Sequence, residues 1–75
     1  MDVDTAVRRV EAEYIRATKE FGPMASAHEG YAVILEEMDE LWEVIKNPPF
    51  DHKRGKAEEA IQVAAMAIRF LVDCC

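Results

Sequence analysis

The stretch AIQVAAMAIRFLV, residues 60–72, decides the fold of this chain. Only Gln62 and Arg69 interrupt its apolar character, and it contains neither proline nor glycine. A helix that is apolar on nearly every side has to be surrounded by other elements. Two further helices in a chain of 75 residues cannot wrap it completely, so we expect its second face to pack against another subunit.

Two breaks divide the chain into three stretches of helical period. The breaks are Gly22-Pro23 and Pro48-Pro49, and no stretch shows the alternation typical of a strand. The stretches cover roughly residues 4–21, 26–46 and, from 51 or 55 onward, the remainder. The sequence therefore predicts an all-α fold, an antiparallel helical bundle of three helices, which oligomerisation completes into a larger bundle.

The second stretch has the clearest amphipathic pattern. Ser26 and Glu29 form a capping box, in which the two side chains satisfy free N–H groups of the first helical turn. Because its apolar residues follow steps of three and four, we expect them to face the core. They are Tyr31, Ile34, Leu35, Met38, Leu41, Trp42 and Ile45.

Composition narrows the classes of partner and compartment. Fifteen acidic against nine basic residues give a net charge of −6, which opposes binding to nucleic acid. No apolar run has the length of a signal peptide core or a membrane span, so we expect no membrane partner. The only two cysteines, Cys74 and Cys75, are adjacent and close no loop, which favours a cytoplasmic protein.

Carboxylates gather on one face of the second stretch. Glu36 and Glu40 are four residues apart and Glu37 and Glu40 three apart, so their Cβ atoms lie about 5–6 Å from one another. On an exposed face their repulsion costs a few tenths of a kcal/mol, and the cluster is a plain solvated surface. In a partly enclosed site each pair repels by about 3 kcal/mol, and the carboxylates then require a cation such as Mg²⁺ or Mn²⁺.

The polar residues of the third stretch also share one face. Steps of three, seven and four separate Glu59, Gln62, Arg69 and Asp73. On an otherwise buried helix this register predicts a polar cavity, with Glu59 and Gln62 placed to face the carboxylates of the second stretch. The alternative is a solvent edge, on which Arg69 and Asp73 pair with each other.

Two acidic motifs, Glu37-x-x-Glu40 and then Glu59-x-x-Gln62, resemble those of the MazG-like all-α nucleoside triphosphate pyrophosphohydrolases, whose pattern is ExxE followed by ExxD. The likeness extends over residues 28–42 and 58–67 and is to small phage-type or bacterial members. It implies that residues 1–75 form a single MazG-like helical domain. It also implies hydrolysis of an NTP or dNTP to a monophosphate and pyrophosphate, as in a house-cleaning role.

The same resemblance implies the site. Glu37, Glu40 and Glu59 match the family's ligands for Mg²⁺, or Mn²⁺, and Glu36 and Glu37 are the implied catalytic residues, with Glu36 as an adjoining ligand or general base. Gln62 stands where the family has an aspartate, and its amide oxygen is a weaker metal ligand. The alternative function is therefore a catalytically impaired MazG-like module that binds nucleotide or protein.

A basic cluster precedes the helix that carries Glu59. Lys53, Arg54 and Lys56 are placed to contact triphosphate oxygens, although a solvated loop explains them equally well. MazG-like enzymes usually form four-helix units that dimerise or tetramerise. With three predicted helices, we expect this chain to be a homodimer or homotetramer, or else a shortened copy. Its expected partners are a nucleoside triphosphate and further copies of itself.

Overall fold

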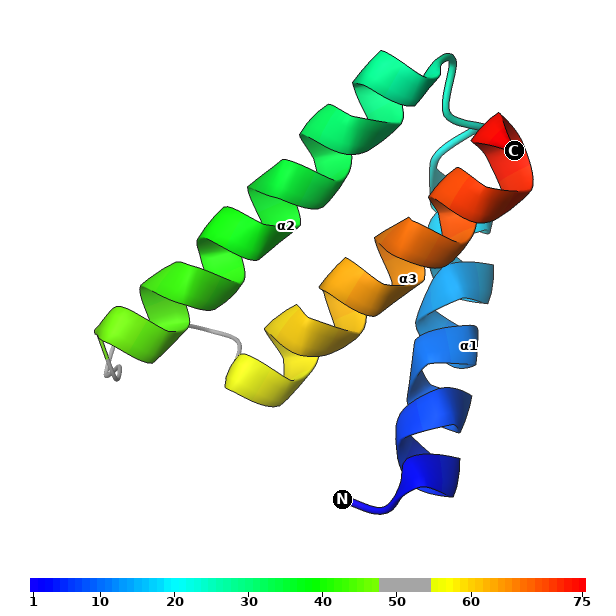
Figure 1. The fold of residues 1–75 in the computed structure, drawn as a ribbon. Coiled ribbons are helices and arrows are strands. Elements are labelled where there is room, and N and C mark those ends of the chain that lie inside the picture. Colours follow the sequence, from blue (N-terminus) through cyan, green and yellow to red (C-terminus); the bar gives the residue numbers. More distant parts are fainter. Residues whose placement is uncertain (48–54) are drawn as a thin grey trace.

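The computed structural model describes residues 1–47 and 55–75, which form three helices and no strand. The helices are α1 (Val3–Glu20), α2 (Ala27–Lys46) and α3 (Lys56–Cys74) (Figure 1). The all-α prediction with three helices is confirmed, and the first break lies at Gly22-Pro23 as expected. The Pro48-Pro49 break lies outside the described residues.

Side chains cap the first two helices. Asp2 accepts a hydrogen bond from the backbone N–H of Thr5 at 2.8 Å, and this bond lowers the pKa of its carboxyl. The Ser26 hydroxyl accepts from the N–H of Glu29 at 3.1 Å, while Glu29 Oε1 accepts from the N–H of Ala25 at 3.3 Å. The predicted capping pair is therefore present, with Glu29 reaching one residue further back than in the standard box.

The apolar helix α3 lies in the middle of the chain's fold. It packs against α2 on one side and α1 on the other, while α1 and α2 share no helix–helix interface within the described ranges. Figure 1 shows α2 and α3 side by side and running in opposite directions. The buried core is small, with Ala17, Ala65 and Met66 at its centre and Val10, Tyr14, Val33 and Ile34 packed around them.

Most of the apolar stripe of α2 faces away from this core, which corrects the sequence prediction. Tyr31 and Trp42 are 58% and 56% exposed, and Leu35, Met38 and Ile45 are exposed as well; only Ile34 and Leu41 are half-buried. The buried positions of α2 are Gly30 and Val44. A Cβ at Gly30 would meet Phe70 Cδ2 at 2.7 Å, so the smallest residue of α2 marks its closest approach to α3.

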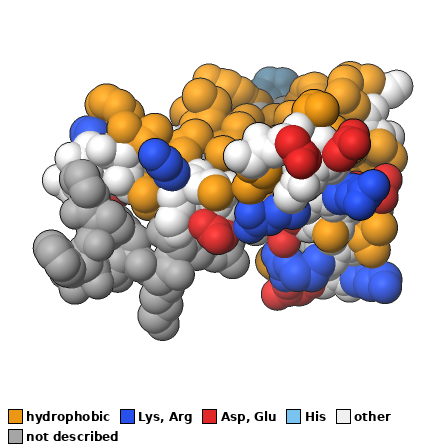
Figure 2. All heavy atoms as spheres, turned by 90° about the horizontal axis from the view of Figure 1, so that it is seen from below, with side chains coloured by type: hydrophobic (Ala, Val, Ile, Leu, Met, Phe, Trp, Pro, Cys, Tyr) orange, Lys and Arg blue, Asp and Glu red, His pale blue; other side chains and the backbone are white. Residues whose placement is uncertain are grey.

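Two apolar surfaces are therefore open in a single chain. The first is a hollow of about 360 Å³ on α2 and α3, and the second is a groove of about 610 Å³ between α1 and α3. Figure 2 shows exposed hydrophobic side chains as a broad band along the upper edge of the view. No helix in the described part of the chain is both long enough and apolar enough to cross a membrane.

Candidate functional site

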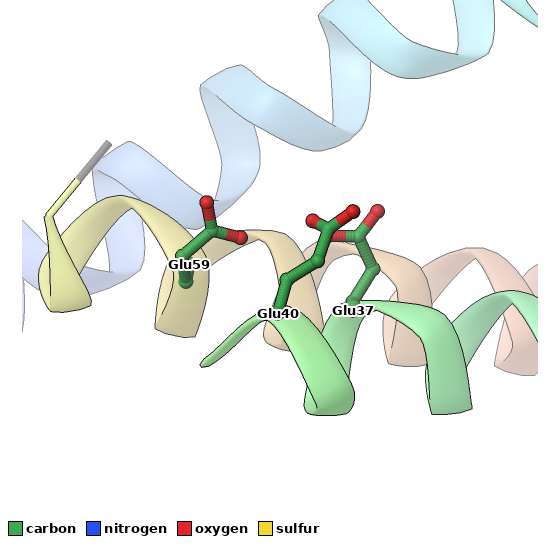
Figure 3. A group of neighbouring side chains, drawn as sticks. All are labelled: Glu37, Glu40 and Glu59. Atoms are coloured by element: carbon green, nitrogen blue, oxygen red, sulfur yellow. The ribbon is translucent and has the colours of Figure 1, made fainter. Parts of the chain in front are cut away.

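Three carboxylates from two helices meet at one point. Glu37 and Glu40 of α2 and Glu59 of α3 each place one oxygen within 4.8 Å of the others. Figure 3 shows the Glu37 and Glu40 side chains rising from one helix toward the same side as Glu59 on the next. The opposite direction of α2 and α3 explains the meeting, because it sets the first turns of α3 beside the second half of α2 (Figure 1). The structure thus brings together the three acidic residues that the two motifs single out.

Burial within this acidic cluster is graded. Glu59 is only 5% exposed and Glu37 is half-buried, whereas Glu40 is exposed. One oxygen of Glu37 and one of Glu59 are shielded from solvent. The plain solvated surface is therefore the wrong interpretation for Glu37, whereas Glu36 and Glu40 are exposed as that alternative expects. A cluster that is buried on one side and open on the other also leaves room for water or a ligand at the exposed side.

The oxygens lie slightly further apart than the ligands of one Mg²⁺ ion. Oxygens bound to one Mg²⁺ at 2.0–2.1 Å are at most about 4.2 Å apart. The three oxygens here lie within 4.8 Å, so small side-chain rotations would bring them to that distance. The donors are all hard carboxylate oxygens, which suit Mg²⁺ and Mn²⁺ rather than a soft metal.

The other acidic residues of α2 lie outside the cluster. Glu36 is exposed and, with Glu37, lines a cavity between the three helices. Glu43 accepts a hydrogen bond from Asn47 Nδ2 at 2.7 Å and lies 3.5 Å from Lys46 Nζ. Glu36 therefore lines the adjoining cavity without belonging to the three-carboxylate group. Glu43 interacts with Lys46 and Asn47 at the C-terminal end of α2.

The polar stripe of α3 points inward. Gln62 and Arg69 are 7% and 5% exposed, so the predicted polar cavity is present and the solvent-edge alternative is wrong. Arg69 and Asp73 do not pair with each other. Instead Arg69 Nη2 donates to the carbonyl of Gly22 at 2.8 Å, and Asp73 Oδ2 accepts from the N–H of Met24 at 3.0 Å. Both residues thus fasten the loop between α1 and α2 to α3.

The cavity beside the acidic cluster has a volume of about 440 Å³. Its charged and amide side chains come from all three helices: Arg16, Glu29, Glu36, Glu37, Gln62 and Arg69. Gln62 also lines a second hollow of about 410 Å³ between α1 and α3, so it lies between the two spaces. A buried amide at this position can offer its carbonyl oxygen to either space.

Sequence reasoning missed the contribution of α1 to the cavity. Arg16 lines it and is paired with Glu13 and Glu20, which raises the pKa of the guanidinium. The spacing of three and four residues between these charges was visible in the sequence. It gave no sign, however, that Arg16 lies across a cavity from α2, because only the packing of helices decides that.

The predicted phosphate-binding residues are only partly described. Lys56 is the exposed first residue of α3, and Lys53 and Arg54 lie outside the described residues. The structure thus leaves their role a prediction. Neither cysteine lines the cavity or belongs to the acidic cluster. Desolvation and the nearby Asp73 carboxylate raise the pKa of Cys74, which disfavours its thiolate.

Comparison of the chain with known proteins gives no match. No family model, no curated protein and no solved structure is significantly similar to it. The resemblance of the two acidic motifs to the MazG-like enzymes stays a prediction from the residues. A function for the site has to be argued from its geometry.

Proposed function

We propose that this protein is a Mg²⁺-dependent nucleoside triphosphate pyrophosphohydrolase, which hydrolyses an NTP or dNTP to a monophosphate and pyrophosphate. One observation carries the proposal: Glu37, Glu40 and Glu59 place oxygens within 4.8 Å of one another. A cavity of about 440 Å³ adjoins them through Glu37. Hydrolysis of a phosphoanhydride requires such a cation site beside a space that admits the phosphates.

The roles of the side chains follow from their positions. Glu37, Glu40 and Glu59 hold the cation, and Gln62, one turn after Glu59, offers a neutral oxygen nearby. When bound, the cation offsets phosphate charge and lowers the pKa of a coordinated water. Glu36 lines the same cavity as Glu37, and its carboxylate orients the attacking water and accepts its proton.

Self-association belongs to the same proposal. The exposed apolar side chains of α2 form a continuous stripe along one helix face, which a monomer of this size rarely leaves open. A second copy covering this stripe completes an antiparallel bundle, as a homodimer or homotetramer. The protein would then act in the cytoplasm, where its free thiols stay reduced.

Pyrophosphate release from a panel of NTPs and dNTPs tests the activity. We expect turnover with Mg²⁺ or Mn²⁺, none with a chelator, and a loss of at least about a hundredfold in Glu37→Gln. Asp39→Asn is the matched control, because it removes one charge from an exposed position of the same helix. Equal turnover by wild type and Glu37→Gln would contradict the proposal.

A second candidate is favoured by Gln62. An amide in place of a carboxylate removes one negative charge next to the proposed cation, and Gln62 is buried there. The protein would then be a catalytically impaired module that binds nucleotide or protein without hydrolysing it. Nucleotide binding without turnover, together with turnover gained in Gln62→Asp, would favour this candidate over the enzyme.

A further inference from the structure

Arg69 is a buried cation with few partners. It is 5% exposed, and no carboxylate of the described residues lies within ion-pair distance of it. A guanidinium carries five N–H donors. The described residues accept from two of its nitrogens only, namely the carbonyl of Gly22 at 2.8 Å and the thioether sulfur of Met66, a weak acceptor, at 3.4 Å.

The third nitrogen, Nε, is buried and has no hydrogen-bond partner among the described residues. A buried charge without a counter-ion is costly, and so is each donor left without an acceptor. Holding one loop carbonyl does not need a permanent charge, because a neutral donor would do the same. The side chain is therefore suited to an anion that enters from outside the chain.

The cavity connects Arg69 to the acidic cluster. Arg69 and Glu37 both line it. Gly30 touches Phe70, the neighbour of Arg69, and Glu37 lies seven residues further along α2, which corresponds to about 10 Å along the helix. The two side chains therefore line one cavity at levels about two helical turns apart. A chain of phosphates is extended enough to lie along such a cavity from one side chain to the other.

We propose that Arg69 binds the phosphate chain of a polyphosphate ligand at the end opposite the cation held by Glu37, Glu40 and Glu59. The inference rests on the proposed function for the identity of the ligand as a nucleoside triphosphate. It assigns the phosphate-binding role to a buried residue of α3 instead of the basic residues that precede that helix. It also makes the site selective for polyphosphate over orthophosphate, because only a chain reaches both charges.

Calorimetric titration with tripolyphosphate and with orthophosphate, each with Mg²⁺, tests this without any turnover. For wild type we expect tripolyphosphate to bind at least about a hundredfold more tightly than orthophosphate. In Arg69→Gln and Arg69→Lys tripolyphosphate affinity should fall at least about tenfold, since a bidentate donor is lost, while Mn²⁺ binding at the carboxylates is retained. Arg8→Gln is the control, because it removes the same charge from an exposed position of α1.

A measurement on the unmodified protein covers the case in which the variants do not fold. The Nε–Hε signal of Arg69 in a ¹⁵N NMR spectrum should shift when tripolyphosphate is added and stay in place with orthophosphate. No shift with tripolyphosphate, or equal affinity in wild type and a folded Arg69 variant, would overturn the inference. If the Arg69-dependent binding is found but no nucleotide is hydrolysed, the enzymatic proposal fails and the role of Arg69 stands.

Discussion

The two faces of α2 present opposite chemistry. The face toward α3 combines Gly30 and Val44, which are buried, with half-buried Val33, Ile34 and Glu37. The opposite face carries the large apolar side chains, among them Tyr31 and Trp42, which are 58% and 56% exposed. The face of α2 that carries Gly30 and Glu37 therefore packs against α3 and places carboxylates at the site. The opposite, apolar face is exposed in the single chain and is available to pack against another molecule.

The difference shows why amphipathicity alone does not orient a helix. A stripe of apolar residues has to be covered by something, but it does not say by which chain. Close approach of two helices depends instead on small residues at the crossing, here Gly30 against Phe70. Four substitutions test this contrast between the inward and outward faces of α2.

The largest effect is expected on the outward face. Trp42→Glu places a charge in the apolar hollow that Trp42 lines with Met38 and Ile45, where Lys46 Nζ now lies 5.7 Å from the ring centroid. If this face packs against a second copy, an aromatic residue buried there contributes about 2–4 kcal/mol to association. Analytical ultracentrifugation should then show dissociation at least about thirtyfold easier than for wild type.

The control for this change is Val3→Glu, because Val3 is 74% exposed and lies on α1. It adds the same charge in place of an apolar side chain without touching α2. The same assembly size and affinity in wild type and Trp42→Glu would mean that the outward face is not the interface.

The next largest effect is expected on thermal stability in the presence of Mg²⁺, and it depends on the acidic cluster at the inward face of α2. A ligand at a hundred times its dissociation constant stabilises a protein by about 2.7 kcal/mol. We therefore expect Mg²⁺ to raise the melting temperature of wild type but not that of Glu59→Gln, which loses the buried carboxylate of the cluster. Thermal melts with and without Mg²⁺ measure both.

Asp39→Asn serves as the control and should keep the full Mg²⁺ response. An undiminished response in Glu59→Gln would show that the ion binds elsewhere.

A third effect, of about 1–3 kcal/mol, is expected at the crossing of α2 and α3. Gly30→Ala improves the helix propensity of α2 by about 1 kcal/mol. The added Cβ, however, would lie 2.7 Å from Phe70 Cδ2 and 2.9 Å from Met24 Sδ. Because overpacking of a ring contact usually outweighs such a gain, we expect net destabilisation in urea unfolding.

Gly30→Ala with Phe70→Leu tests the cause, since the smaller side chain relieves the contact. A double-mutant cycle should show a favourable coupling between the two changes. Stabilisation by Gly30→Ala alone would mean that α2 lies further from α3 than the structure places it.

These contrasts also show which features of the fold could be predicted from the sequence. The first two helices, the Ser26 cap and the inward Glu59 and Gln62 follow from local periodicity and spacing. The rotation of α2 about its axis does not, because the apolar stripe is wider than the face that α3 covers. The sequence signal that could have corrected it was Gly30, a helix-weakening residue near the start of the predicted helix, where it suggests a close approach.

The site shows the same limit. The register of the third stretch predicted that Glu59 faces the carboxylates of α2, and the resemblance of the two motifs singled out Glu37, Glu40 and Glu59, which the structure brings together. The cavity itself needed three-dimensional packing. Arg16 reaches it from α1, and that placement leaves no mark on local spacing. Arg69 belongs to the polar stripe that predicts the cavity, but its bond to the carbonyl of Gly22 cannot be read from that stripe.

The smallest effect is expected at Ser26, the N-cap of α2, which lies on neither face of the helix and therefore serves as a reference for the other substitutions. Ser26→Ala removes the hydroxyl that accepts from the N–H of Glu29 at 3.1 Å, and loss of such a cap costs about 1 kcal/mol. The change should lower stability in urea while leaving assembly and the Mg²⁺ response as in wild type. Ser26→Asp is the control, since a carboxylate caps as well and should restore stability. If Ser26→Ala instead weakened Mg²⁺ binding as strongly as Glu59→Gln, loss of the carboxylate could no longer be separated from general loosening of α2. The assignment of the inward face to the cation would then lose its support.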